Sequence, residues 1–252
     1  MTHLRRCAVG ARGSRSAVLT ARSLSLLQVQ KTWDPLHLEA ADLTVFFPWS
    51  DATAPRTTRH SVLLEGGAAF GTGAHPTTVL CLEFLRAAAA DGARVLDYGS
   101  GAGLLALAAV KYGAAVPVSA VEIDLSAIDT AEGNAAANDM ADAVRFYVPP
   151  GGGAGDGQQA AGVARPELDD AAEFDVVVAN ILASHLVPLA DELARRTRTG
   201  GRLGLSGVLA SQAASVMGSF EAAGFVGLEV VGLASAAQSG VDEWVLVEGV
   251  RG

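Results

Sequence analysis

From residue 93 onward, short valine-rich apolar runs alternate with longer segments that have the apolar spacing of a helix. The runs expected to be strands are 93–99, 117–124, 144–148, 174–182 and 200–209. The segments expected to be helices are 104–113, 126–138, 186–196 and 211–224. Strands that alternate with helices build parallel sheets with helices on both faces. The sequence therefore predicts an α/β fold.

The last two expected strands, 225–234 and 242–250, break the alternation because no helix lies between them. A short linker with Ser, Gln and Gly joins them, which predicts a hairpin. Seven strands that end in a hairpin differ from the all-parallel dinucleotide-binding sheet. We therefore expect a Rossmann-like seven-stranded sheet with an antiparallel terminal hairpin.

The chain before residue 93 is expected to contain one long helix and a short lead-in. Apolar residues at helical spacing in the segment 76–90 are Val79, Leu82 and Leu85. Two β-rich runs, 43–49 and 61–65, precede this helix. Cys81 lies on the apolar face of the helix, which favours a buried, reduced thiol.

Charge is distributed unevenly along the 252 residues. The first 33 contain six basic residues and no acid, whereas the remaining 219 carry 12 basic and 27 acidic side chains. A segment with this excess of acidic residues does not suit nucleic-acid binding, because neutralising phosphates requires clustered Lys and Arg. It would attract a basic partner instead. No run reaches the roughly 18 apolar residues of a membrane span. We therefore expect a protein substrate, and neither nucleic acid nor a membrane as partner.

Residues 1–32 are rich in Arg, Ser and Ala. This composition is typical of an organelle transit peptide, and a disordered tail is the alternative. The first interpretation predicts a mitochondrial or chloroplast location and the second a cytoplasmic one. Residues 33–68 are then expected to be a linker with lead-in strands, and 69–252 the main domain. A low-complexity insertion at 149–173 is expected to lie on its surface.

A glycine-rich turn follows the first expected strand, in the sequence DYGSGAG. Gly99, Gly101 and Gly103 are spaced as G-x-G-x-G, and such glycines let the backbone turn tightly and approach a ligand beside a helix N-terminus. A nicotinamide fingerprint needs its third glycine one position later, where this chain has Leu104. Asp97 precedes the glycines, and its carboxylate suits a ligand with a cationic group better than one with a pyrophosphate.

Two polar residues end expected strands of the sheet. Glu122 ends the second strand, where nucleotide-binding α/β folds place an acid that accepts the ribose hydroxyls. Asp124 follows on the opposite side of the chain, and either it or Ser126 opens the next helix. Asn180 ends the fourth strand, at the edge where open α/β sheets bind ligands. Its amide could hold an incoming amine, or it could form a turn or cap a helix.

The loop AFGTGAHPTT precedes the long helix. It lacks the lysine of a P-loop, and His75 has no partner at metal-ligand spacing, so neither a phosphate site nor a metal site is expected. Pro76 suits the first turn of a helix, whose N-terminus carries about half a positive charge. The hydroxyls of Thr77 and Thr78, beside free N–H groups, would hold a small carboxylate there.

These expectations together describe one ligand. It has adenosine at the sheet edge, a ribose on Glu122, a cation near Asp97 and a carboxylate near Thr78, and S-adenosylmethionine has each of these parts. The predicted cofactor-binding residues are Thr78, Asp97, Gly99, Gly101, Gly103, Glu122 and Asn180.

Four motifs in the same order carry a resemblance to a known family. AFGTGAHPTT, VLDYGSGAGLLALAAVKYGA with VEID, DVVVANILASHL and GGRLGLSGVLASQA resemble the PrmA family, the methyltransferases of ribosomal protein L-eleven. The similarity implies a class I methyltransferase fold over 69–252, S-adenosylmethionine as cofactor, and N-methylation of lysine or α-amino groups. It places the cofactor contacts on Thr78, Gly99, Glu122 and Asn180, with Asn180 as the catalytic residue near the transferred methyl group.

The chain departs from the family pattern in two places. Asp is common where this chain has Glu122, although either carboxylate can accept ribose hydroxyls. The bacterial enzymes carry a substrate-recognition domain before the linker, whereas here the residues before Trp33 are few and of another composition. The expected substrate is thus a ribosomal protein or another basic organelle protein.

The sequence has three alternative functional interpretations. Relatives that methylate lysines on the β subunit of mitochondrial electron-transfer flavoprotein are an alternative, and a non-catalytic cofactor-binding module is a further one. A nicotinamide-dependent oxidoreductase is disfavoured by the glycine spacing, the terminal hairpin and the missing Tyr/Lys pair.

Overall fold

The strands of the protein form two sheets, one of three strands and one of seven. The structure is a computed structural model, and it describes residues 34–50, 57–65, 73, 75–150, 165–234 and 243–252. The expectations for the tail 1–32 and for most of the insertion 149–173 lie outside these residues.

The larger sheet confirms the predicted Rossmann-like arrangement. Its strands are β4 (Val95–Tyr98), β5 (Val118–Val121), β6 (Val144–Tyr147), β7 (Phe174–Asn180), β8 (Thr197–Leu209), β9 (Phe225–Ala234) and β10 (Trp244–Arg251). They lie in the order β6-β5-β4-β7-β8-β10-β9. The pairs among β4 to β8 are parallel, and β10 is antiparallel to both β8 and β9. The strand order reverses at β4, which is where open α/β sheets bind ligands.

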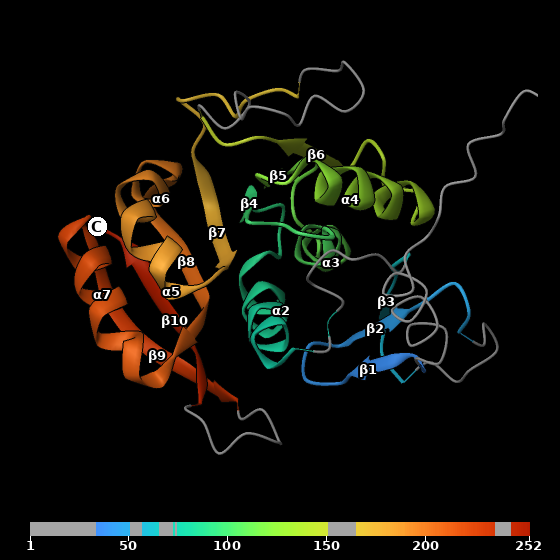
Figure 1. Cartoon of the computed structure of the whole chain (residues 1–252), viewed down its shortest axis with the longest axis horizontal. Coiled ribbons are helices and arrows are strands. Elements are labelled where there is room, and N and C mark those ends of the chain that lie inside the picture. The colour runs from blue at the N-terminus through green and yellow to red at the C-terminus, as the bar shows by residue number, and fades with distance from the viewer. Residues whose placement is uncertain (1–33, 51–56, 66–72, 74, 151–164, 235–242) are drawn as a thin grey trace, which may run out of the picture.

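Helices cover both faces of this sheet. They are α2 (Pro76–Ala88), α3 (Leu104–Tyr112), α4 (Leu125–Ala137), α5 (Ala183–Leu186), α6 (Ala190–Arg196) and α7 (Ala213–Ala222), with 3-10 turns η2 (Val187–Leu189) and η3 (Ala210–Gln212). In Figure 1, α2, α3 and α4 lie on one side of the sheet and α5, α6 and α7 on the other. The helix predicted at 186–196 is in fact α5, η2 and α6, because Pro188 lacks an N–H and interrupts regular helical bonding.

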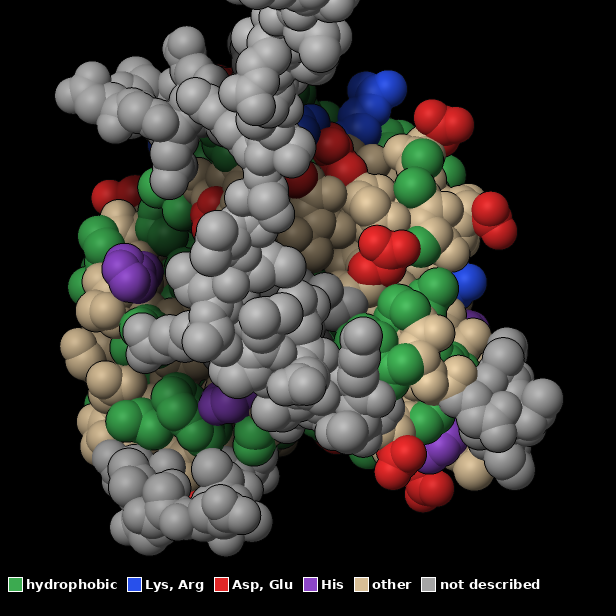
Figure 2. Space-filling view, turned by 45° about the vertical axis from the view of Figure 1, so that its right-hand side comes forward, with side chains coloured by type: hydrophobic (Ala, Val, Ile, Leu, Met, Phe, Trp, Pro, Cys, Tyr) green, Lys and Arg blue, Asp and Glu red, His purple; other side chains and the backbone are tan. Residues whose placement is uncertain are grey.

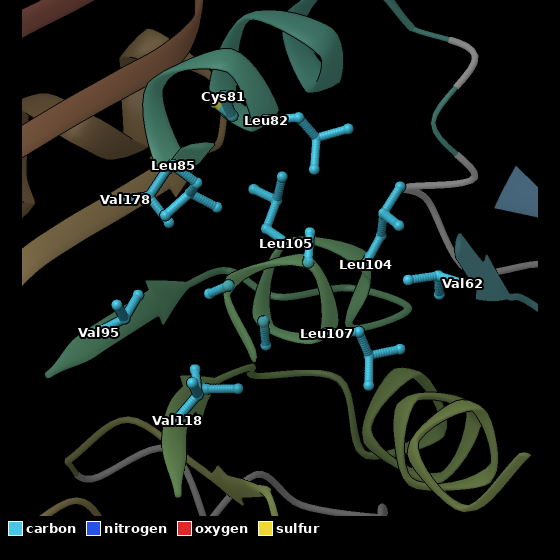
Figure 3. Packing of buried hydrophobic residues seen from close by; sticks show 14 of the residues in the cluster. Val62, Cys81, Leu82, Leu85, Val95, Leu104, Leu105, Leu107, Val118 and Val178 are labelled. Carbon is cyan, nitrogen blue, oxygen red and sulfur yellow. The ribbon is translucent and has the colours of Figure 1, made fainter. Parts of the chain in front are cut away.

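One hydrophobic core lies between the sheet and the pair α2 and α3. Cys81, Leu82 and Leu85 of α2 are fully buried, and Leu105 of α3 points toward this helix (Figure 3). Cys81 is a free cysteine and is buried, as predicted, and burial raises the pKa of its thiol. Val79 was predicted on the same face but is only half-buried, because the arc that faces the sheet is centred on Cys81.

The smaller sheet consists of the lead-in strands. They are β1 (Leu36–Leu38), β2 (Leu43–Phe46) and β3 (His60–Leu63), in that order. β1 was not predicted, and it pairs antiparallel with β2, whereas β3 pairs parallel with β2. The sheet packs on α3, where Val62 lies beside Leu104 (Figure 3), and the hydroxyl of Tyr112 donates to the carbonyl of Ala41 at 2.6 Å.

The surface reflects the acidic composition. Acidic side chains are spread over the right-hand part of the face drawn in Figure 2. Within the described part of the chain, the helices are all too short or too polar to cross a membrane.

Candidate functional site

A pocket lies at the carboxyl edge of the parallel strands, beside β4. Its lining residues are His75, Thr77, Thr78, Gly99, Ser100, Gly101, Leu104, Leu105, Glu122, Asn180, Ile181, Leu182, His185, Gly207 and Trp244. Its volume of about 400 Å³ falls in the range of roughly 300–1,000 Å³ that is usual for small-molecule sites. Five of the predicted cofactor residues line it, and the other two, Asp97 and Gly103, lie behind its wall.

The glycine turn between β4 and α3 forms the floor of the pocket. Gly99 has φ +83°, and a β-carbon there would lie 2.4 Å from the Cγ2 of Ile181. The N–H groups of Gly99 and Ser100 donate to the carbonyl of Val121 on β5, at 2.8 and 3.0 Å. Only glycine fits position 99, and the turn is anchored to the neighbouring strand.

Gly103 serves packing rather than the pocket. It is the N-cap of α3 with φ +83°, and a β-carbon there would lie 3.1 Å from the Cβ of Ala131 on α4. Gly103, which is predicted to bind the cofactor, does not line the pocket, because its Cα faces the helix behind the turn.

Asp97 is fully buried on β4, directly before the turn. Its Oδ2 accepts the N–H of Ala106 at 3.1 Å, while its Oδ1 has no hydrogen-bond partner among the described residues. Burial, together with the nearby charge of Glu122, raises the pKa of this carboxyl to about 7, although the N–H of Ala106 opposes the shift. The hydroxyl of Ser100, in the pocket wall, is likewise buried and unpaired within the described chain. Unpaired buried polar atoms of this kind are where a polar ligand is expected to bind.

Glu122 follows β5 and reaches back to the glycine turn. Its Oε2 accepts the N–H of Gly101 at 2.8 Å, and its Oε1 accepts those of Ile123 and Asp124 at 2.8 and 3.0 Å. A carboxylate has about four acceptor positions, so one remains for a ligand. To accept both hydroxyls of a diol, the carboxylate must share one of its acceptor positions between a backbone N–H and a hydroxyl. The carboxylate is thus held in a fixed orientation at the pocket wall.

Asp124 is the residue that opens α4. Its side chain accepts the N–H of Ser126 at 2.8 Å, which makes it the N-cap. The prediction of Ser126 as the cap is therefore wrong, because the helix begins one residue before Ser126, at Leu125. The alternative assignment of Asp124 to helix capping is confirmed.

Asn180 and Thr78 meet across the pocket. Asn180 is the last residue of β7, and its Nδ2 donates to the Oγ1 of Thr78 on α2 at 3.3 Å. Thr78 is buried, and its own hydroxyl proton is directed by this contact away from Asn180. The two residues are brought together although neither was predicted to contact the other.

The N-terminus of α2 differs from the prediction. His75 is its N-cap: the imidazole Nδ1 accepts the N–H of Thr77 at 3.3 Å and lies 2.7 Å from the Oγ1 of Thr77. The carbonyl of His75 accepts the N–H of Thr78 at 3.0 Å. The amides predicted to be free for a carboxylate are therefore already paired, and the hydroxyls are the remaining polar groups. Residues 69–72 and 74 of this loop lie outside the described chain.

His75 also takes part in the pocket wall. Partial burial lowers the pKa of its imidazole, which favours the neutral ring that an accepting Nδ1 requires. The ring packs edge-on against Trp244, with 5.1 Å between the centroids. Among the described residues no cluster of His, Cys, Asp or Glu has the arrangement of a metal site.

Sequence reasoning missed several residues of the wall, above all Trp244 and His185. Trp244 begins β10. Because β10 is antiparallel, its first residue lies at the edge where the parallel strands end. The position of Trp244 at this edge therefore follows from the predicted terminal hairpin, whereas nothing in the sequence pattern indicated His185.

Comparison with known proteins places the chain among methyltransferases. The model of a family described as "Ribosomal protein L11 methyltransferase (PrmA)" matches residues 26–248. A ribosomal protein L11 methyltransferase from Thiobacillus denitrificans is 44% identical over 188 residues, covering 75% of this chain and 56% of that protein. One from Shewanella baltica is 43% identical over 164 residues, covering 64% and 50%.

A solved structure has a similar fold. The ribosomal protein L11 methylase of Lactobacillus delbrueckii subsp. bulgaricus superposes with a TM-score of 0.67 at 26% identity, covering 87% of this chain and 99% of that one. This chain spans about half the length of the two relatives from Thiobacillus and Shewanella. The relatives named are bacterial and do not support the expected organelle location. They also point neither to the flavoprotein β subunit nor to a non-catalytic module.

Proposed function

The chain belongs to the ribosomal protein L11 methyltransferase (PrmA) family, and on this premise we propose that it transfers methyl groups from S-adenosylmethionine to amino groups of ribosomal protein L11. The observation that carries the proposal is the pocket at the strand-order reversal, where Thr78, Gly99, Glu122 and Asn180 converge. These are the positions that the family resemblance assigns to the cofactor.

The residues present fit this cofactor. Glu122 offers an acceptor position for the ribose hydroxyls, and the unpaired Oγ of Ser100 offers a polar contact that the described chain does not satisfy. Asp97, which is buried behind the pocket wall, would act on the cationic part of the cofactor through its charge. The absence of a β-carbon at Gly99 lets the turn lie against Ile181. The hydroxyl of Thr78 takes the place of the helix amides that His75 already occupies.

The bound cofactor would supply a methyl carbon made electrophilic by a positively charged sulfur. The chain's contribution is then to position the partners and to exclude water. Apolar side chains of Leu104, Leu105 and Ile181 line the pocket. The amide of Asn180, fixed by its bond to Thr78, orients the attacking nitrogen through its free carbonyl oxygen. The amine would react in its neutral form after its ammonium proton is lost to solvent, and the methyl–sulfur bond of the cofactor would break as the new nitrogen–carbon bond forms, leaving a neutral thioether.

Lysine ε-amino groups are the finer substrate class that we propose, with α-amino groups as a second. The 219 residues after position 33 carry 27 acidic and 12 basic side chains, and an acidic surface attracts a basic substrate protein. The apolar side chains in the pocket lining, among them Leu104, Ile181 and Leu182, suit the long methylene chain of lysine, which carries its charge at the end.

Calorimetric titration followed by a transfer assay tests the proposal. S-adenosylmethionine should bind and nicotinamide dinucleotides should not, and purified L11 should then gain methyl groups in the presence of the cofactor. Binding of a nicotinamide dinucleotide in preference to S-adenosylmethionine would refute the proposal.

A further inference from the structure

Asn134, in the last turn of α4, is the one fully buried amide side chain of that helix. Asparagine disfavours helix interiors, and a buried amide is costly unless it is hydrogen-bonded. Both polar atoms of Asn134 are paired, and both partners lie outside the helix. Its Oδ1 accepts the N–H of Glu65 at 2.7 Å, and its Nδ2 donates to the carbonyl of Ala102 at 2.9 Å.

The two partners belong to different parts of the molecule. Glu65 follows β3 of the small sheet, 69 residues before Asn134. Ala102 lies inside the glycine turn, between Gly101 and Gly103, and is itself buried. The bond to Ala102 therefore satisfies a carbonyl within the turn that forms the pocket floor.

The same face of α4 supports the turn in a second way. Ala131, one turn before Asn134, is fully buried, and a β-carbon on Gly103 would lie 3.1 Å from its Cβ. The turn thus rests on α4 through one close approach at Gly103 and one hydrogen bond to the carbonyl of Ala102.

The neighbouring Asn138 provides a comparison within the same helix. Its Oδ1 accepts the N–H of Leu63 at 2.8 Å, and its Nδ2 donates to the carbonyls of Leu63 and Asn134, both at 2.7 Å. Asn138 therefore ties α4 to β3 as Asn134 does, but it has no contact with the glycine turn.

We propose that Asn134 is a positioning residue for the cofactor: its amide fixes the Ala102 carbonyl and so sets the glycine turn against α4 and the lead-in strand. The proposal rests on the proposed function, because it assumes that the turn binds S-adenosylmethionine. It assigns the effect to binding, through Gly101 and the pocket floor, and not to the methyl transfer itself.

The variants Asn134→Asp and Asn138→Asp test this assignment. Each keeps an acceptor for the β3 segment and loses the amide donor, but only the first leaves a carbonyl of the glycine turn unpaired. Isothermal titration with S-adenosylmethionine gives the dissociation constant, and calorimetry gives the melting temperature. Because an unpaired buried carbonyl is strongly unfavourable, we expect Asn134→Asp to weaken binding about five- to tenfold and Asn138→Asp less than about twofold.

A pH series adds a measurement whose result would not change if the substitution only lowered the stability of the fold. A protonated aspartic acid can donate to Ala102, and burial raises the pKa of such a carboxyl. Lowering the pH from about 8 to about 6 should therefore bring the affinity of Asn134→Asp back toward that of the wild type measured at the same pH. If Asn134→Asp does not fold, Asn134→Ser replaces it in the titration.

The possible results distinguish a failure of the proposed function from a failure of the role of Asn134. A wild-type chain that does not bind S-adenosylmethionine overturns the proposed function and this inference with it. A wild type that binds, with equal losses in the Asn134 and Asn138 variants or with no recovery at low pH, overturns the role of Asn134 alone.

Discussion

The amide of Asn180 at the end of β7 donates to the hydroxyl of Thr78 on α2, at 3.3 Å and across 102 residues of sequence. The bond joins a residue of the sheet edge to a residue of the first helical turn of α2. It fixes which end of the Asn180 amide points away from α2, and so leaves the carbonyl oxygen for a ligand or a substrate amine.

Asn180→Ala is expected to retain cofactor binding and to lose methyl transfer. Removing the amide leaves the glycine turn and Glu122 intact, but it removes the group that orients the attacking nitrogen, which should lower kcat about a hundredfold. Titration with S-adenosylmethionine and single-turnover kinetics separate the two effects. Turnover unchanged from the wild type would contradict the role of Asn180.

Thr78→Val is expected to weaken cofactor binding. Valine keeps the shape of the buried side chain and removes its hydroxyl, so the loss of one hydrogen bond should raise the dissociation constant about five- to tenfold. Thr78→Ser, which keeps the hydroxyl, is the matched control and should bind nearly as the wild type does. Equal affinity of the Val and Ser variants would show that the hydroxyl makes no contact with the cofactor.

Gly99→Ala is expected to destabilise the fold and to abolish cofactor binding. Gly99 has φ +83°, and the added carbon would lie 2.4 Å from Ile181. Gly92→Ala is the control, because Gly92 also has a positive φ, +77°, but a β-carbon added there would meet no neighbouring atom within 4 Å. Both variants should lose about 1–2 kcal/mol for the left-handed backbone, and only Gly99→Ala should lose about 1–3 kcal/mol more for the clash. Denaturant titration that gives equal losses would contradict the packing against Ile181.

Affinity for S-adenosylmethionine should rise as the pH increases through about 7. Burial raises the pKa of Asp97 to about 7, so the carboxyl becomes ionised in that range, and its negative charge favours a cationic ligand. Asp97→Asn cannot ionise, and the ratio of its dissociation constant to that of the wild type should increase with pH. A ratio that stays constant would show that the cofactor does not respond to the charge of Asp97.

The same carboxyl affects the stability of the free protein with the opposite sign. Its folded pKa of about 7 lies above the ordinary value of 3.8, so the folded chain binds the proton more tightly than the unfolded chain does. This contribution to stability is fully present below the unfolded pKa and is lost as the pH rises through about 7. Melting temperatures of the wild type and Asp97→Asn, compared over this range, should converge at acidic pH.

The regular part of the fold could be predicted because each strand and helix carries its own pattern. Short apolar runs at β4, β5, β7 and β8 and the missing helix before β10 were enough for the seven-stranded sheet. The short β1 could not be predicted, because three residues have no periodicity of their own and pair only when β2 is already in place. Likewise, the break between α5 and α6 depends on one proline within an otherwise helical pattern.

The part of the candidate site that could be predicted consists of residues whose type, or whose place at the end of a strand, determines the local geometry. Gly99 requires a positive φ, and Glu122 and Asn180 stand at strand ends, so their positions follow from the sequence. The pairing of the α2 amides by His75, and the bonds of Asn134 to Glu65 and Ala102, are tertiary contacts between distant segments. Sequence patterns contain no signal for such contacts.

The most direct test of the account is intact-mass spectrometry of ribosomal protein L11 after incubation with the full chain and S-adenosylmethionine, with Asn180→Ala as the parallel reaction. The account predicts mass increments of one or more methyl groups on L11 with the wild type, located on lysine or α-amino nitrogens by peptide mapping, and about a hundredfold slower accumulation of these increments with the variant. An unmodified L11 together with a wild-type chain that binds the cofactor in titration would contradict it.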